Sequence, residues 1–364
     1  MTGAAVGPPG RFGLIGHGWR ADFYLRIAQA APDLFSCAGA VTRGERSGRA
    51  LEDAWGIPTY RSVQELLSNE QMEAVVVSVP RAAAPAIVFE LVDAGVRALV
   101  ETPPAADLDS LRALWDRVGD SELVRVAEQH PFLPIVVAIR RIIASGAVGD
   151  ATFAAISWTH DYHAMAMLRA ILGIGGEPVR IVGTSREVRQ HVAPDRYGRP
   201  GTVAEAKQTH SVAILEAPGK LGIYDFTSNQ WFDPLRRRRL LVRGSRGEVD
   251  AAEVTWLTEC DTPMTAAIQR RQVGIDGNLE GMELDTLSWA GEVVYANPFR
   301  GTRLSDEEIA IATCLQLAVH PGSMTGYSLA NATQDQYLSL VLRDAVASGA
   351  ARTTASQAWH ERMR

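Results

Sequence analysis

The stretch Phe12 to Ile27, FGLIGHGWRADFYLRI, decides the fold of this chain. A short apolar run over residues 12–15 breaks at Gly16-His17-Gly18 and is followed by apolar residues at helical spacing. Strand, glycine turn and helix in this order are typical of a dinucleotide site, in which Gly16 permits the turn, Gly18 lets a diphosphate approach the backbone, and Ala21 replaces a third glycine. The helix then offers unpaired N–H groups and a positive dipole end to phosphates.

A glycine turn without a ligand has the same local pattern, so the surrounding sequence has to decide between the two interpretations. Strands are expected at 36–41, 74–79, 98–100 and 123–127, and helices at 63–67, 86–94 and 108–118, with a further helix beginning at Leu51 to Trp55. This alternation predicts a doubly wound parallel sheet of the Rossmann type. A glycine turn at the start of such a sheet favours the dinucleotide site.

Composition restricts the class of protein. The 364 residues are enough for two domains, and the formal charge of −6 gives no basic surface for nucleic acid. No apolar run approaches the roughly twenty residues that a membrane span needs. The cysteines Cys37, Cys260 and Cys314 are far apart and odd in number, and residues 1–10 read as a flexible lead-in without signal-peptide features. We expect a cytoplasmic protein that binds neither nucleic acid nor membrane.

The end of the second strand bears on the choice of cofactor. An acidic residue there accepts from the ribose of NAD, whereas arginine pairs with the 2′-phosphate of NADP. Thr42-Arg43 stands at this point, with Arg46 close behind, which favours NADP. Glu45 lies near enough to keep NAD open, and Arg43 is also compatible with a plain surface residue.

The second half of the chain changes pattern and predicts an α+β domain with a large, mostly antiparallel sheet. Strands are expected at 152–158, 179–185, 211–216, 222–228, 238–242 and 292–295, and helices at 165–172, 307–318 and 330–346. Residues 186–209 are polar and rich in turn formers, and are interpreted as a long irregular segment that is either functional or floppy. The arginines at 236–239 fit a solvated strand edge better than an anion site.

Five segments in one order resemble the Gfo/Idh/MocA oxidoreductases: GLIGHGWRA at 13–21, VVVSVP at 75–80, AGVRALVETP at 94–103, EQHPFLP at 128–134 and IRRIIASGAVGD at 139–150. The resemblance implies a dinucleotide-binding domain at 11–134, a substrate and oligomerisation domain at 135–304, and helices at 305–364 that pack back on the first domain. It also implies a homodimer or homotetramer formed through the second sheet. The cofactor contacts then expected are Gly16, His17, Gly18, Trp19, Arg20, Thr42, Arg43, Val79, Pro80, Glu101 and Gln129.

Two landmarks of the family are altered. Relatives carry Glu-Lys-Pro at the end of the fifth strand, where the lysine contacts the nicotinamide ribose and the reacting hydroxyl and the proline commonly follows a cis bond. Here the triplet is Glu101-Thr102-Pro103. A lysine can tune its pKa for proton transfer, whereas a threonine hydroxyl hydrogen-bonds or relays.

The second landmark is an aspartate followed four residues later by a histidine that points at the nicotinamide. In SWTHDYHAMAMLR, residues 157–169, His163 matches the histidine, Thr159 replaces the aspartate and Ala166 replaces a further acidic residue. Imidazole suits proton transfer near neutral pH, so His163 is the first catalytic candidate, with Thr102 and His160 beside it. His163 is also compatible with a core or capping role. The spacing of His160, Asp161 and His163 fits no zinc pattern, and no metal is expected.

Three functions stay open. The first is an NAD(P)-dependent oxidoreductase that moves a hydride to or from a hydroxyl or carbonyl carbon of a sugar, cyclitol or similar small molecule. Arg189, Arg196 and Arg199 would suit an anionic group on that substrate. The second is a non-catalytic NADP(H)-binding descendant, which the lost lysine and aspartate favour. The third is a lyase, epimerase or hydrolase that uses tightly bound NAD(P) transiently.

Overall fold

The computed structural model describes residues 8–199, 201–274, 281–320 and 326–363. The chain packs as two compact units, each discontinuous in sequence. The first takes the described residues of Met1–Pro134, Arg271–Thr286 and Ala296–Thr333, and the second those of Ile135–Arg270, Leu287–Tyr295 and Gln334–Arg364. The domain boundaries expected from sequence stay predictions, since compact packing does not test whether each part folds alone. Most of the lead-in at 1–10 lies outside the described residues.

The first unit contains a six-stranded sheet whose order, β3-β2-β1-β4-β5-β6, is that of a dinucleotide-binding Rossmann sheet. All of its neighbouring strands pair in parallel, which confirms the predicted fold class of this half. Gly10 already belongs to the first strand rather than to a lead-in. The strands are β1 Gly10–Ile15, β2 Phe35–Val41, β3 Thr59–Tyr60, β4 Ala74–Val77, β5 Arg97–Val100 and β6 Val124–Val126.

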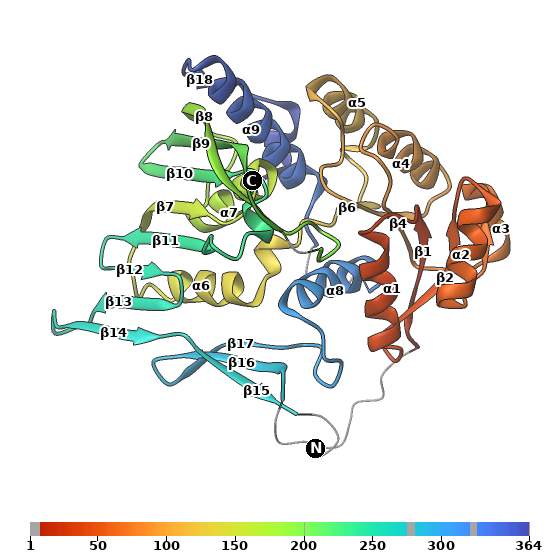
Figure 1. Cartoon of the computed structure of the whole chain (residues 1–364), viewed down its shortest axis with the longest axis horizontal. Helices are drawn as coiled ribbons and strands as arrows, with labels where there is room; N and C mark the ends of the chain where they lie inside the picture. The colour runs from red at the N-terminus through yellow and green to blue at the C-terminus, as the bar shows by residue number, and fades with distance from the viewer. Residues whose placement is uncertain (1–7, 200, 275–280, 321–325, 364) are drawn as a thin grey trace. The chain divides into compact units, whose positions relative to one another are not determined.

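Helices cover both faces of this sheet. Its inner strand β4 is therefore buried along its whole length. Helix α1 packs on β2 and on α8, and α8 packs on β1 and β5. Helix α4 packs on β4 and β5 and contacts α3 and α5 (Figure 1). The helices are α1 Ala21–Ala30, α2 Glu45–Trp55, α3 Val63–Asn69, α4 Ala84–Asp93, α5 Leu108–Val118 and α8 Asp306–Val319, with a 3₁₀ turn, η1, at His130–Phe132. Leu51 to Trp55 is the end of α2, not the start of a helix.

The second unit is built on a nine-stranded sheet of order β14-β13-β12-β11-β7-β10-β9-β8-β18. Strands β7 and β10 pair in parallel and the other neighbours are antiparallel, as expected from sequence. The strands are β7 Ala151–Ser157, β8 Arg180–Val192, β9 Thr202–Ala217, β10 Lys220–Thr227, β11 Arg239–Gly244, β12 Gly247–Asp250, β13 Glu253–Leu257, β14 Pro263–Ala267 and β18 Arg352–Thr353. A three-stranded sheet has the order β15-β16-β17, with bounds Gln269–Val273, Glu283–Trp289 and Glu292–Ala296.

The irregular segment expected at 186–209 is wrong for most of its length. Strands β8 and β9 extend into it and pair in register from Arg180 opposite Glu216 to His191 opposite Glu205 (Figure 1). Charged or polar residues occur on both sides of these extensions and only scattered apolar residues lie between them, so no sustained apolar alternation marks them as strands. The backbone ladder and cross-strand ion pairs, such as Lys207 to Glu187 at 2.8 Å, hold the hairpin instead.

One face of the nine-stranded sheet is covered by α7, Asp161–Leu172, which packs on β7 and β10. The other helices of this unit are α6 Pro134–Ala144 and most of α9 Leu329–Ser348, with 3₁₀ turns η2 at Gln230–Phe232 and η3 at Ala358–Met363. The buried guanidinium of Arg169 on α7 pairs with Asp335 of α9 at 2.5 Å. Removing either partner would take away this buried ion pair, and breaking such a pair typically costs about 3–5 kcal/mol.

The sheet face opposite α7 is apolar and open. Along β9, Ala213 and Leu215 are buried, whereas Val212 and Ile214 are 38% and 41% exposed. Leu221 on the neighbouring strand β10 is 37% exposed.

None of the helices in the described ranges is both long and apolar enough to cross a bilayer.

Candidate functional site

The glycine turn at the end of β1 has the geometry that a dinucleotide site requires. Gly16 has φ of +104°, and a Cβ at this position would lie 2.1 Å from the carbonyl oxygen of Ser78. The backbone of the turn is fixed on both sides, because Gly16 N donates to Val41 O at 3.1 Å and Ser78 N donates to Ile15 O at 2.9 Å. The turn therefore lies between β2 and β4, and a side chain at Gly16 is excluded by sterics and by φ.

Gly18 differs from Gly16, since a Cβ there would meet no heavy atom within 4 Å. His17 and Gly18 are exposed. Helix α1 begins just after them, with Arg20 at the N-cap position and no side-chain cap on its amides. Anions often bind where open space lies beside a helix end that no side chain caps, so this geometry is compatible with the cofactor contacts predicted at Gly16, His17 and Gly18, which stay predictions.

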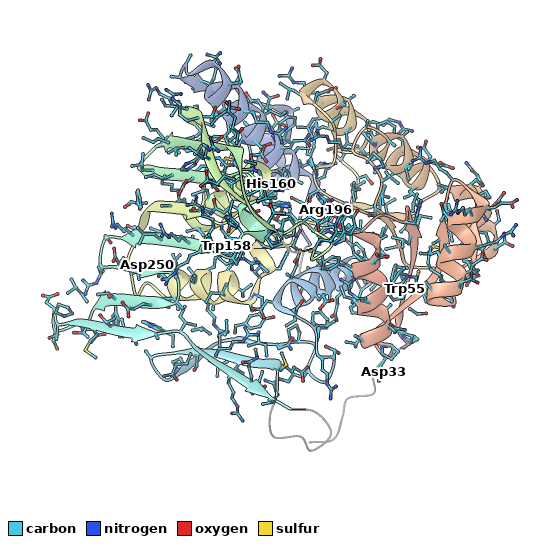
Figure 2. All side chains as sticks on the ribbon, in the orientation of Figure 1. Asp33, Trp55, Trp158, His160, Arg196 and Asp250 are labelled. Atoms are coloured by element: carbon cyan, nitrogen blue, oxygen red, sulfur yellow. The ribbon has the colours of Figure 1, made fainter. Side chains whose placement is uncertain are left out.

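The segment after β2 lies beside a pocket of about 520 Å³. Its polar lining consists of His17 from the glycine turn, Asp22 from α1, and Arg46 and Ser47 from the first turn of α2. The remaining lining is apolar and extends to Trp55 (labelled in Figure 2). Arg43 is exposed and does not line the pocket. Of the two arginines expected to favour NADP, Arg46 is thus the one at a cavity.

Two further observations refine the choice between NAD and NADP. Glu45 forms an exposed i,i+4 pair with Arg49 at 3.0 Å, which engages its carboxylate. The hydroxyl of Thr42 is buried, donates to Gly44 O and accepts from Arg61. The hydroxyl of Thr42 is therefore used inside the protein to hold the loop after β2. Its partner Arg61 was not among the residues predicted from sequence.

The Glu101-Thr102-Pro103 triplet follows β5, and the Thr102–Pro103 peptide is cis, as the resemblance implies. Glu101 accepts a hydrogen bond from Tyr24 Oη at 2.6 Å and one from Thr102 N at 3.3 Å. Burial and the adjacent Glu101 raise the pKa of Tyr24 well above its usual value, so the phenol stays protonated and donates. Glu101 thus orients the start of the segment that carries Thr102.

The other cofactor contacts predicted in this unit follow β4 and β6. Val79 and Pro80 come directly after β4, with Val79 half-buried and Pro80 exposed. Gln129 is buried, 3% exposed, and its carbonyl accepts from Phe132 N in the turn η1. Since the carboxyl ends of parallel strands meet at one sheet edge, the structure brings these residues to the same edge as the glycine turn.

In the second unit, the predicted catalytic segment lies where β7 gives way to α7. His160 is at the N-cap of α7, and its side chain is 55% exposed (Figure 2). Its Nδ1 lies 2.9 Å from Asp161 Oδ1, and Asp161 also pairs with Arg343 of α9. Burial alone would raise the pKa of Asp161, but the hydrogen bonds from His160 and Arg343 outweigh it and hold this pKa well below its usual value. His160 therefore has a permanently charged carboxylate beside it.

His163 lies one turn further along α7 and is 8% exposed. Its ring centroid is 4.9 Å from that of His160 and 5.3 Å from that of Tyr162. Thr159, which stands in the place of the family aspartate, is 2% exposed. The structure thus brings the two predicted histidines into contact, within one unit.

Two of the three arginines suggested for an anionic substrate, Arg189 and Arg199, pair with acidic side chains. Arg189 pairs with Glu205 across the β8–β9 hairpin at 3.2 Å, and Arg199 donates to Asp195 at 2.7 Å. In the run at 236–239, Arg236 pairs with Asp233, and Arg238 lies 4.0 Å from the Trp231 ring. These local pairs do not favour an anion site at either segment.

Comparison with known proteins agrees with this geometry. Residues 10–129 match the family profile described as "Oxidoreductase family, NAD-binding Rossmann fold" (GFO_IDH_MocA). A D-xylose 1-dehydrogenase (NADP(+)) 2 of Haloferax volcanii is 30% identical over 119 residues, which is 32% of this chain and 37% of that enzyme. The match therefore spans little more than a third of the curated relative.

Solved structures cover nearly the whole chain at low identity. An oxidoreductase of Agrobacterium radiobacter, in complex with NAD+, L-tartaric acid and magnesium, has a TM-score of 0.68 at 15% identity, covering 94% of this chain and 97% of its own. A myo-inositol dehydrogenase of Corynebacterium glutamicum has a TM-score of 0.64 at 16% identity, covering 96% and 100%. At this identity the likeness concerns the fold. Together with the glycine turn, the profile match shows that residues 10–129 are similar to the NAD-binding Rossmann segment of the Gfo/Idh/MocA oxidoreductases.

Proposed function

We propose that the protein is an NAD(P)-dependent dehydrogenase that acts on a CH–OH group of a sugar, cyclitol or similar polyol. The observation that carries the proposal is the open space over Gly18 beside the uncapped end of α1, in a chain that matches an NAD-binding Rossmann family. The named relatives supply the substrate class, since one is a D-xylose dehydrogenase and another a myo-inositol dehydrogenase.

NADP is the preferred cofactor. His17, Arg46 and Ser47 line one pocket beside the glycine turn, and Arg46 would pair with a 2′-phosphate there. Glu45 forms an exposed pair with Arg49 and does not line this pocket, so its carboxylate gives little support for NAD. Titration with NADPH and NADH, followed by calorimetry, tests this preference: tighter binding of NADH would contradict it.

The nicotinamide, when bound, supplies the hydride acceptor for the carbon that is oxidised. The chain has to take the hydroxyl proton, and we assign this to the imidazole of His163. Thr102 would donate a hydrogen bond from its hydroxyl to the reacting oxygen. The backbone of Thr102 is held in place because its N–H donates to the Glu101 carboxylate. His160, held by Asp161, would support the position of His163 through ring contact.

Changing Thr102 to valine is expected to lower kcat/KM by about tenfold, the effect of losing one hydrogen bond to the reacting oxygen. Thr102→Ser keeps the hydroxyl and should retain most of the activity. Steady-state kinetics with the best polyol of a panel measures both. Equal losses in the two variants would show that the hydroxyl alone does not account for the effect, and would contradict the assigned role.

The reaction is tested by adding a panel of aldoses and cyclitols to the protein with NADP+ or NAD+ and following absorbance at the reduced nicotinamide band. Turnover with net cofactor reduction supports the dehydrogenase. Substrate conversion without net reduction would favour a lyase or epimerase with transient oxidation. Cofactor binding without turnover of any compound would favour the non-catalytic descendant, to which the altered Thr102 and Thr159 point.

Homo-oligomerisation through the nine-stranded sheet is part of the proposal. The apolar residues exposed on β9 and β10, Val212, Ile214 and Leu221, form a face that a second copy would cover. Ile214→Asp is expected to shift the protein toward a monomer of 39.4 kDa in light scattering, since burying a carboxylate there is costly. Val293→Asp, at a 49% exposed valine of the other sheet, is the matched control and should leave the mass unchanged. A wild-type protein that is already monomeric would contradict this part.

A further inference from the structure

We propose that Arg20 is a positioning residue, which holds the glycine turn in its cofactor-binding conformation by tying it to Glu101 and to Glu307 of α8. Arg20 Nη1 donates to Glu307 Oε1 at 3.0 Å, and Arg20 Nε lies 3.9 Å from Glu101 Oε2. The three side chains are only 14–24% exposed. This inference rests on the proposed dinucleotide site.

The charges of Arg20, Glu101 and Glu307 favour a lasting ion pair between the guanidinium and the two carboxylates. Burial would lower the pKa of Arg20, but the carboxylates of Glu101 and Glu307 outweigh it and raise this pKa, so the guanidinium stays charged. The guanidinium also lies 4.7 Å from the centroids of the Trp19 and Phe23 rings. Arg20 is thus restrained by carboxylates and by two aromatic faces, including that of its neighbour in the turn.

The hydrogen bonds that fix Gly16 between β2 and β4 do not include the amides of His17 and Gly18, which form the exposed part of the turn. His17 and Gly18 are exposed, and a Cβ on Gly18 would touch nothing within 4 Å. Ala21 N donates to Gly18 O at 2.8 Å, which links the turn to the start of α1. Fixing Arg20 therefore fixes the amides that would face a diphosphate, and a pre-formed site binds more tightly than one that must be ordered on binding.

Glu101 extends the effect to the segment that carries Thr102. Its Oε1 accepts from Tyr24, while its Oε2 accepts from Thr102 N and lies closest to Arg20. The guanidinium thus connects the turn after β1 with the segment after β5. Loss of Arg20 is expected to loosen both segments.

Helix α8 offers a matched pair of variants. Glu307 and Glu308 are adjacent, and each forms an ion pair with an arginine: Glu307 with Arg20 at the N-cap of α1, and Glu308 with Arg26 within α1 at 3.2 Å. Glu308 also completes the capping box with Ser305 at the start of α8. Glu308→Ala should therefore destabilise the protein at least as much as Glu307→Ala, yet it leaves the turn untouched.

The experiment measures the NADPH dissociation constant by calorimetry and the melting temperature of the full-length protein for Glu307→Ala, Glu308→Ala, Arg20→Met and Arg20→Lys. We expect Glu307→Ala and Arg20→Met to weaken NADPH binding by about tenfold or more, Arg20→Lys to recover part of the loss, and Glu308→Ala to leave binding within about twofold. Binding that follows melting temperature across all four variants would overturn the inference, as would unchanged binding in Glu307→Ala. A wild-type protein that binds no NADPH would instead overturn the proposed function.

Discussion

Replacing His163 by asparagine is expected to lower kcat by about 10² to 10⁴-fold, the contribution typical of a positioned general acid or base. Asparagine keeps hydrogen-bonding capacity and similar size but cannot exchange a proton near neutral pH. NADPH binding should stay within about twofold of wild type, because the diphosphate contacts are assigned to the glycine turn and His163 is not among them. Single-turnover and steady-state kinetics on the best polyol, with calorimetry for the cofactor, measure the two quantities.

His210→Asn is the matched control for this prediction. His210 lies on β9, and its Nε2 is 2.6 Å from Asp225 Oδ1. It is not part of α7, and no catalytic role is assigned to it. Its replacement should leave kcat within about twofold. A His163→Asn variant that retains wild-type kcat would refute the assignment and would return His163, at 8% exposed, to the core role that its burial also permits.

Gly18→Ala is expected to weaken NADPH binding by about a hundredfold, because the new methyl group would occupy the space through which a diphosphate approaches the backbone. The same substitution should change the melting temperature little, since a Cβ at Gly18 meets no heavy atom within 4 Å. Gly16→Ala is a poorer test. Its Cβ would lie 2.1 Å from Ser78 O at φ of +104°, so loss of folding would obscure loss of binding.

Gly56→Ala gives the opposite pattern and serves as the control. Gly56 ends α2 in the left-handed region, with φ of +67°, and a Cβ there would also meet open space. Alanine should destabilise the fold by about 1 kcal/mol through backbone strain and leave NADPH binding unchanged. Unchanged cofactor binding in Gly18→Ala would count directly against a diphosphate at this turn.

Much of the fold follows from local patterns. The continuous apolar strand at 74–77 and the turn at Gly16 each carry their own signal, so strand, turn and helix assignments held within a few residues there. The β8–β9 hairpin carried none, because its polar strand extensions are paired through the backbone and through ion pairs such as Lys207 to Glu187. Polar strands of this kind look like loops to any method based on apolar periodicity.

The candidate site divides in the same way. A motif was enough to select Gly16, Gly18 and the Glu101-Thr102-Pro103 triplet, and it located His163 through its neighbours in sequence. Arg61 beside Thr42, Arg343 beside Asp161 and Glu307 beside Arg20 were missed, because each partner is separated from its site in sequence by 19, 182 or 287 positions. Such pairs have no spacing that a sequence can display.

By itself the sequence determined the Rossmann sheet, the glycine turn and the residue types that can carry proton transfer, since each depends on neighbours a few positions apart. Tertiary structure alone decided which distant charges meet: Asp161 with Arg343, and Arg20 with Glu101 and Glu307. The physical reason is that a side chain's charge acts on whatever lies within a few ångströms in space, and folding sets those neighbours without regard to distance along the chain.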